Sequence, residues 1–73
     1  MPKANIKNEI RRLRFEAGEM TQQELADRIE CTRQTIVMLE QGRYVPSLAL
    51  ALKIAHAFNT GVEAIFTLQP DDE

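Results

Sequence analysis

The sequence predicts an all-α fold in which five short helices pack around one core. Three observations support this prediction. Apolar residues recur at helical spacing over most of the 73 residues, residues that cap helices stand between these stretches, and no stretch alternates convincingly as a half-buried strand would. The length suits one small domain, which we expect over residues 1–68, followed by an acidic, disordered tail over residues 69–73.

The first helix is expected over about residues 5–17. Ile6, Ile10 and Leu13 lie three or four positions apart, so they would share one side of the helix. Gly18 marks its end. The helix therefore has an apolar side that can pack against the rest of the chain.

The next two helices are short and joined by a tight turn. Thr21 can cap the first of them, and Glu24 three positions later completes a capping box. Thr32 is expected to cap the second helix, which ends at Gly42, a residue that readily adopts the left-handed conformation. Two short helices with so little chain between them predict a helix-turn-helix.

Two further helices complete the expected fold. The fourth, over residues 48–58 and capped by Ser47, is apolar nearly all round and is expected to be the central helix, covered on several sides. Thr60 and Glu63 form a second capping-box pattern that opens a short fifth helix.

The third helix has an outward face that is unusual for a solvated helix. At about 100° per residue, Ile36 and Leu39 lie on one side and face the core. An arc of about 140° on the opposite side holds Arg33, Gln34, Val37, Met38 and Gln41. These side chains can read base edges, because Arg pairs with guanine, Gln with adenine, and apolar groups contact the thymine methyl. An ordinary amphipathic helix is the alternative, but the capped partner helix and tight turn favour DNA recognition.

The charge distribution is uneven. The net charge is −2 and the pI about 5.4, which argues against strong nonspecific binding to nucleic acid. However, residues 1–18 hold five Lys and Arg against two Glu, whereas three of the last four residues are acidic. The basic end can therefore face DNA while the acidic tail lies elsewhere, which predicts moderate, salt-sensitive affinity.

Other classes of protein find little support. No run of about 18 apolar residues indicates a membrane span, and the polar start lacks a signal peptide, so we expect a cytoplasmic protein. Cys31 and His56 are the single Cys and the single His, and they indicate neither a disulfide nor a metal site. Cys31 is expected to be a small buried hydrophobe, with a redox role as the alternative. We expect no enzyme activity, cofactor or metal.

Several short motifs together form a specific signature. They are Leu13-Arg14, residues 21–26, residues 32–36, residues 39–42 and Pro46-Ser47-Leu48. With these motifs, about residues 6–66 resemble the Cro and phage-repressor type of helix-turn-helix regulators, the Xre family. The resemblance implies a compact five-helix, lambda-repressor-like domain that binds DNA as a homodimer and regulates transcription, usually by repression.

Family roles are carried over where residues match. Base reading would fall to Arg33, Gln34, Val37 and Met38. Contacts to the DNA backbone would come from Thr21, Gln22, Thr32, Thr35, Gln41, Arg43 and Tyr44. Gln22 resembles the family glutamine that bonds a phosphate and steadies the start of the third helix. Arg14 and Glu40 match a pair that ties the first helix to the third and would contribute under about 1 kcal/mol if exposed.

Three departures from the family pattern bear on the turns and on base reading. Glu30 stands where relatives often have Gly, in a turn that can need positive φ at a cost of about 1 kcal/mol. Met38 stands where relatives often carry a polar base reader. An extra residue, Glu19 or Met20, lengthens the link between the first two helices.

Two functions remain open from the sequence. The first is an autonomous regulator whose dimer places two third helices on a palindromic operator with half-sites about 10 bp apart. Its dimer surface would be apolar and distant from the third helix, with Val62, Ile65, Phe66 and Leu68 as candidates. The second is an antitoxin-like module, or another interaction protein, that binds DNA only with a partner protein.

Overall fold

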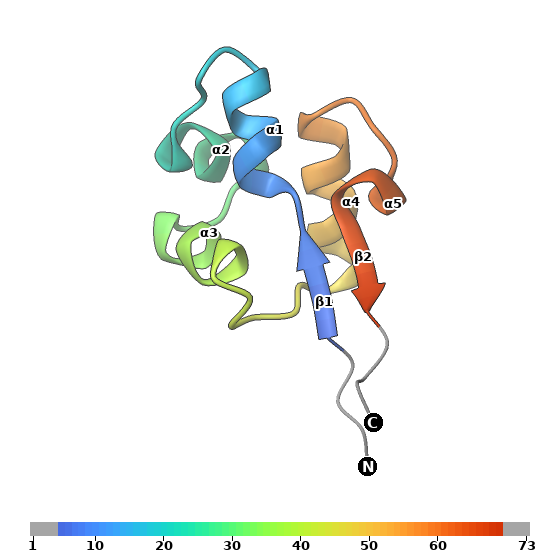
Figure 1. Cartoon of the computed structure of the whole chain (residues 1–73). Coiled ribbons are helices and arrows are strands. Elements are labelled where there is room, and N and C mark those ends of the chain that lie inside the picture. The colour runs from blue at the N-terminus through green and yellow to red at the C-terminus, as the bar shows by residue number, and fades with distance from the viewer. Residues whose placement is uncertain (1–4, 70–73) are drawn as a thin grey trace.

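The computed structural model describes residues 5–69, which form five helices and two strands (Figure 1). In chain order the elements are β1 (Asn5–Asn8), α1 (Ile10–Glu16), α2 (Gln22–Ile29), α3 (Arg33–Glu40), α4 (Leu48–Ala57), α5 (Val62–Ile65) and β2 (Phe66–Gln69). In the view of Figure 1, α2 and α3 lie on one side of β1, and α5 and β2 lie on the other.

The small sheet corrects the all-α prediction. β1 and β2 pair antiparallel, with Ile6 opposite Leu68 and Asn8 opposite Phe66. The first helix therefore begins at Ile10 rather than Asn5. The chain becomes extended at the end of α5, so that its last described segment lies beside its first. The backbone groups that face each other across the two strands are paired.

The predicted acidic, disordered tail over residues 69–73 is described by the structure only at its first residue. Gln69 is the last residue of β2. Residues 70–73, which include Asp71, Asp72 and Glu73, lie outside the described residues.

Side-chain hydrogen bonds cap the N-terminal ends of α2, α3 and α4. The Thr21 hydroxyl accepts the Glu24 N–H at 3.0 Å and the Glu24 carboxylate accepts the Thr21 N–H at 2.8 Å, which confirms the capping box. Thr32 and Ser47 cap α3 and α4 as predicted. The second capping box is wrong, because Gly61 and not Thr60 is the N-cap residue of α5, which places Glu63 one position too early.

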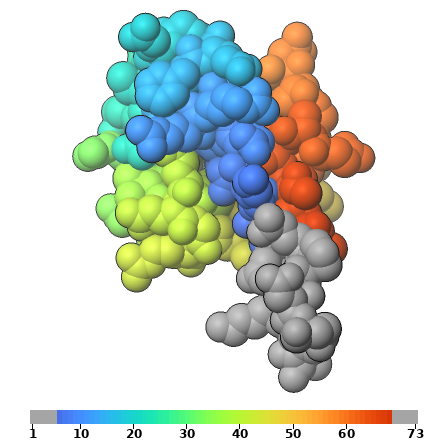
Figure 2. Space-filling view, viewed as in Figure 1, coloured from blue at the N-terminus to red at the C-terminus, as the bar shows by residue number. Residues whose placement is uncertain are grey.

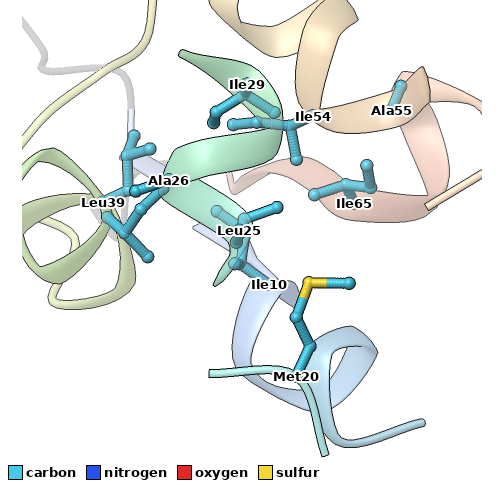
Figure 3. Close-up of a cluster of buried hydrophobic side chains, with 10 residues drawn as sticks. Ile10, Met20, Leu25, Ala26, Ile29, Leu39, Ile54, Ala55 and Ile65 are labelled. Atoms are coloured by element: carbon cyan, nitrogen blue, oxygen red, sulfur yellow. The ribbon is translucent and has the colours of Figure 1, made fainter. Parts of the chain in front are cut away.

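The core draws on every helix and on the link between α1 and α2 (Figure 3). Its buried members are Ile10, Met20, Leu25, Ala26, Ile29, Ile36, Leu39, Ile54, Ala55 and Ile65. Met20, expected only to lengthen a link, is one of them at 6% exposure. Ile36 and Leu39 are fully buried, which holds the inner side of α3 against the rest of the domain.

The prediction that the fourth helix is covered on several sides is wrong. Ala51, Ile54 and Ala55 form its buried side, whereas Leu48 is 73% and Leu52 48% exposed. Leu50 and Ala57 are half-buried and pack against the core, so the helix is buried on one face while Leu48 and Leu52 face outward. The exposed side of α4 therefore combines these two leucines with Lys53 and His56.

Candidate nucleic-acid interface

The turn between α2 and α3 fixes how the two helices meet. Glu30 adopts φ 60° and ψ 45°, the left-handed conformation expected where a family glycine would stand. The Cys31 N–H then donates to the Ala26 carbonyl at 3.0 Å, and Thr32 begins α3 by accepting the Thr35 N–H at 3.3 Å. The helices are thus joined by a turn too short to move freely.

The outward face of α3 has the orientation predicted from helical spacing. Arg33, Gln34 and Gln41 are exposed, while Val37 and Met38 are half-buried. Figure 2 shows the green and yellow side chains of α3 and of the segment after it along one side of the molecule, apart from the red side chains of β2. The proposed base-reading residues are therefore accessible, and their contact with DNA stays a prediction.

The C-terminal end of α3 is held by an ion pair with α1. The Arg14 Nε atom donates to Glu40 Oε2 at 2.6 Å and Nη2 to Oε1 at 3.1 Å. Both side chains are only 9% exposed, so the pair is not the surface pair considered from the sequence. The Arg14 Nη1 atom also donates to the Met20 carbonyl at 2.8 Å, which ties the α1–α2 link to the same site.

Gln22 joins this network at an unexpected place. Its Nε2 atom donates to Glu40 Oε1 at 3.1 Å. Glu40 is the last residue of α3, so the side chain steadies the end of that helix, whereas the resemblance implied its start. The sequence pattern identified the residue but not the end of the helix that it contacts.

The seven residues proposed to contact the DNA backbone all reach the surface. They are Thr21, Gln22, Thr32, Thr35, Gln41, Arg43 and Tyr44, of which Gln22 and Thr35 are half-buried and the others exposed. Thr21 and Gln22 stand at the start of α2 and Thr32 at the start of α3, where helix N-termini favour phosphate.

Asn8 is a residue of this region that sequence reasoning did not select. Its Nδ2 atom donates to the Leu39 carbonyl at 2.8 Å, across 31 positions. No local motif signals such a bond, because Asn8 was expected inside a helix and its partner is a main-chain atom.

The predicted dimer residues fall into two environments. Ile65 is fully buried, so it belongs to the core of the protomer and is not offered to a partner. Val62 and Phe66 are half-buried and pack against that core, whereas Leu68 on β2 is 68% exposed. Ile65 is the last residue of α5 and faces the core, whereas Leu68 lies on β2, which follows α5, and faces outward.

The single Cys and the single His both lie within the described residues. Cys31 is half-buried, and its burial raises the pKa of the thiol, an effect larger than the opposing influence of Lys53. His56 is exposed. Among the described residues, no three His, Cys, Asp or Glu side chains gather as metal ligands would. Nor is any helix in residues 5–69 both long and apolar enough to pass through a membrane.

The α2–turn–α3 unit, with its exposed polar face on the second helix, defines a helix-turn-helix protein. Comparison with known proteins agrees, since the family described as Helix-turn-helix (HTH_3) matches residues 10–65. The chain belongs to this Xre-type family of DNA-binding transcription regulators.

Similar proteins occur in archaea and bacteria. An uncharacterized HTH-type transcriptional regulator of Archaeoglobus fulgidus is 48% identical over 68 residues, 93% of each chain. One of Methanothermobacter thermautotrophicus is 54% identical over 63 residues, covering 85% of this chain and 90% of the relative. The regulator YgzD of Bacillus subtilis is 42% identical over 67 residues, covering 92% of this chain and all of the relative.

Proposed function

We propose that the protein is a homodimeric, sequence-specific repressor that reads the major groove with α3. The observation that carries the proposal is the outward face of α3, where Arg33 and Gln34 are exposed in the first turn while Ile36 on the other side is fully buried. A fork donor and an amide at the start of such a helix suit guanine and adenine edges.

The charges of the domain favour moderate affinity for DNA, with little nonspecific binding. Within residues 5–69, two of the three arginines of α1 are engaged in ion pairs, Arg12 with Glu9 and Glu16, and Arg14 with Glu40. The basic first helix predicted from the sequence is therefore largely neutralised internally. Phosphate contacts would rest on helix N-termini and neutral polar groups more than on cations, so nonspecific affinity would be weak.

The dimer would use the side of the domain away from α3. Leu68 is exposed on β2, two positions after the half-buried Phe66, and the half-buried Val62 begins the preceding helix. In Figures 1 and 2, β2 and α3 lie on opposite sides of β1, so a second copy seated on β2 would leave α3 open. A two-fold dimer of this kind matches a palindromic operator whose half-sites are about 10 bp apart.

Repression requires only that the protein occupies its site on the DNA. A dimer bound over a promoter excludes other proteins from the same DNA, whereas activation needs an additional contact with the transcription machinery. The proposed contact of α3 with DNA is sufficient for repression but not for activation.

A second function is favoured by one observation on α4. Leu48 and Leu52 lie one turn apart and are 73% and 48% exposed, which leaves apolar surface that a different protein could cover. The protein would then be an antitoxin-like module that binds DNA only with its partner.

The test is selection of bound sequences from a random duplex library by the purified protein at moderate salt. Enrichment of a palindromic motif by the protein alone supports the autonomous repressor. Without enrichment, a motif that emerges only after a copurified protein is added supports the partner-dependent function. Repression is then checked by placing the selected motif over the promoter of a reporter gene.

A further inference from the structure

We propose that Asn8 is a positioning residue for DNA recognition, which ties the β1–β2 sheet to the C-terminal end of α3 and so sets the angle at which α3 enters the groove. The inference rests on the proposed function of α3. It concerns a residue outside the helix-turn-helix, one that would touch no DNA itself.

Both polar atoms of the Asn8 side chain are used. The Nδ2 atom donates to the Leu39 carbonyl at 2.8 Å, and the Oδ1 atom accepts the Ile10 N–H at 3.2 Å. The Leu39 carbonyl also accepts the Gly42 N–H at 3.0 Å, so both of its lone pairs are satisfied. One half-buried amide thus bridges the first residue of α1 and the last turn of α3.

The main chain at Asn8 is itself fixed by long-range bonds. Asn8 pairs with Phe66 in the sheet, and the N–H of the next residue, Glu9, donates to the Ile65 carbonyl at 2.9 Å. Asn8 is therefore held by the β2 end of the domain while its side chain holds α3. It connects the side of the domain proposed to dimerise with the helix proposed to read bases.

The polar contacts that fix α3 to the rest of the domain gather at one end. Asn8, Arg14 and Gln22 come from three different elements and all reach Leu39 or Glu40. The start of α3, which carries Arg33 and Gln34, is held by its own cap and the short turn. Polar anchoring at the far end of the helix thus controls where the base-reading end points.

A small change at the anchored end would matter at the other. Arg33 lies six positions from Leu39, about 9 Å along the helix, so a tilt of about 10° moves it by about 1.5 Å. Base-edge hydrogen bonds tolerate displacements of only about 0.5 Å. Loss of the Asn8 bond should therefore weaken specific binding to the operator more than it weakens nonspecific binding through phosphate contacts.

The substitution Asn8→Asp separates the two bonds of the side chain. It keeps an oxygen for the Ile10 N–H but replaces the donor to Leu39 with a negative charge at the C-terminal end of a helix, where the dipole disfavours it. Asn8→Ser tests the same loss without adding a charge. The serine oxygen can still accept the Ile10 N–H, but the side chain is too short to reach the Leu39 carbonyl. Asn59→Asp, on the exposed turn after α4, makes the same chemical change as a control.

The measurement is the ratio of affinities for the selected operator and for a scrambled duplex, taken well below the melting temperature. Because all of the protein is then folded, a loss of stability alone leaves the ratio unchanged. We expect Asn8→Asp and Asn8→Ser to lower the ratio by about tenfold, the effect of one poorly read base pair, and Asn59→Asp to leave it unchanged. Amide chemical shifts of the free variants should change as far as residues 33–35.

Wild-type ratios for both folded Asn8 variants, with shift changes confined to residues 8–10 and 39–42, would overturn the inference. Arg33→Ala in the same assay separates this result from failure of the proposed function. If Arg33→Ala loses specificity while the Asn8 variants keep it, α3 reads DNA and Asn8 does not position it. A wild-type protein that selects no operator, alone or with a partner, would overturn both.

Discussion

Arg14 and Glu40 form a two-point ion pair across 26 positions, with Nε to Oε2 at 2.6 Å and Nη2 to Oε1 at 3.1 Å. Both side chains are 9% exposed, so their charges are removed from water together. Such a pair stabilises little beyond an apolar packing, but removal of one partner leaves a buried charge uncompensated. The packing of α3 against α1 should therefore depend strongly on both charges of this pair.

Glu40→Gln should destabilise the domain by about 3 kcal/mol, because the Arg14 guanidinium would remain buried without its counter-charge. Urea unfolding monitored by circular dichroism measures this free energy. Glu16→Gln is the control, since it breaks an exposed ion pair with Arg12 and should leave the free energy of unfolding nearly unchanged. Equal changes in the free energy of unfolding for the two substitutions would mean that burial of the Arg14–Glu40 pair does not increase the cost of breaking it.

Leu68→Glu should weaken the proposed dimer while the protomer keeps its helical signal. Leu68 is 68% exposed, so a charge at this position costs the protomer little but disrupts an apolar interface. Light scattering over a concentration series measures the change. Phe66 is a poorer probe because it packs against the core. A Leu68→Glu protein that stays as dimeric as the wild type would exclude β2 as the interface.

Glu30→Gly should stabilise the protein by up to about 1 kcal/mol, because glycine adopts the left-handed conformation of this turn without a Cβ penalty. Gly42→Ala should do the opposite by a similar amount. Gly42 has φ 73°, and a Cβ there would meet no atom within 4 Å, so the loss would come from the backbone and not from a clash. Thermal melts of the two variants check both signs, and a gain from Gly42→Ala would refute the argument from backbone conformation.

The Cys31 thiol should react more slowly with iodoacetamide in the folded protein than in urea near pH 8, because burial raises its pKa and thiolate is the reactive form. The same shift lowers stability as the pH rises through the folded pKa, since the unfolded thiol ionises first. Cys31→Ser should therefore flatten the alkaline side of the stability profile. Faster alkylation of the folded protein would instead favour the redox role.

Sequence reasoning located the helix-turn-helix because its signals are local. Thr21, Thr32 and Ser47 each cap the helix that follows them within three residues. The left-handed conformation of Glu30 could be anticipated because this residue stands where members of the resembled family often have glycine. The orientation of α3 also followed, because helical periodicity alone separates Ile36 from Arg33.

The parts that sequence reasoning missed depend on residues far apart in the chain. Ile6 has the spacing of a helical residue, and only its pairing with Leu68 makes it part of a strand. The side chain of Asn8, on the same strand, bonds the Leu39 carbonyl 31 positions away, and Ile65, just before the partner strand, is fully buried. The two exposed leucines of α4 were misjudged for the same reason, since periodicity shows that a helix is apolar but not how many neighbours cover it.

The most direct test of base reading by α3 is to repeat the random-duplex selection with Arg33→Ala and Gln34→Ala, each compared with the wild type in a thermal melt. We expect wild-type melting for both variants, loss or broadening of the selected motif for Arg33→Ala, and a changed base preference at one position in each half-site for Gln34→Ala. A motif identical to that of the wild type in both folded variants would contradict the claim that α3 reads the operator.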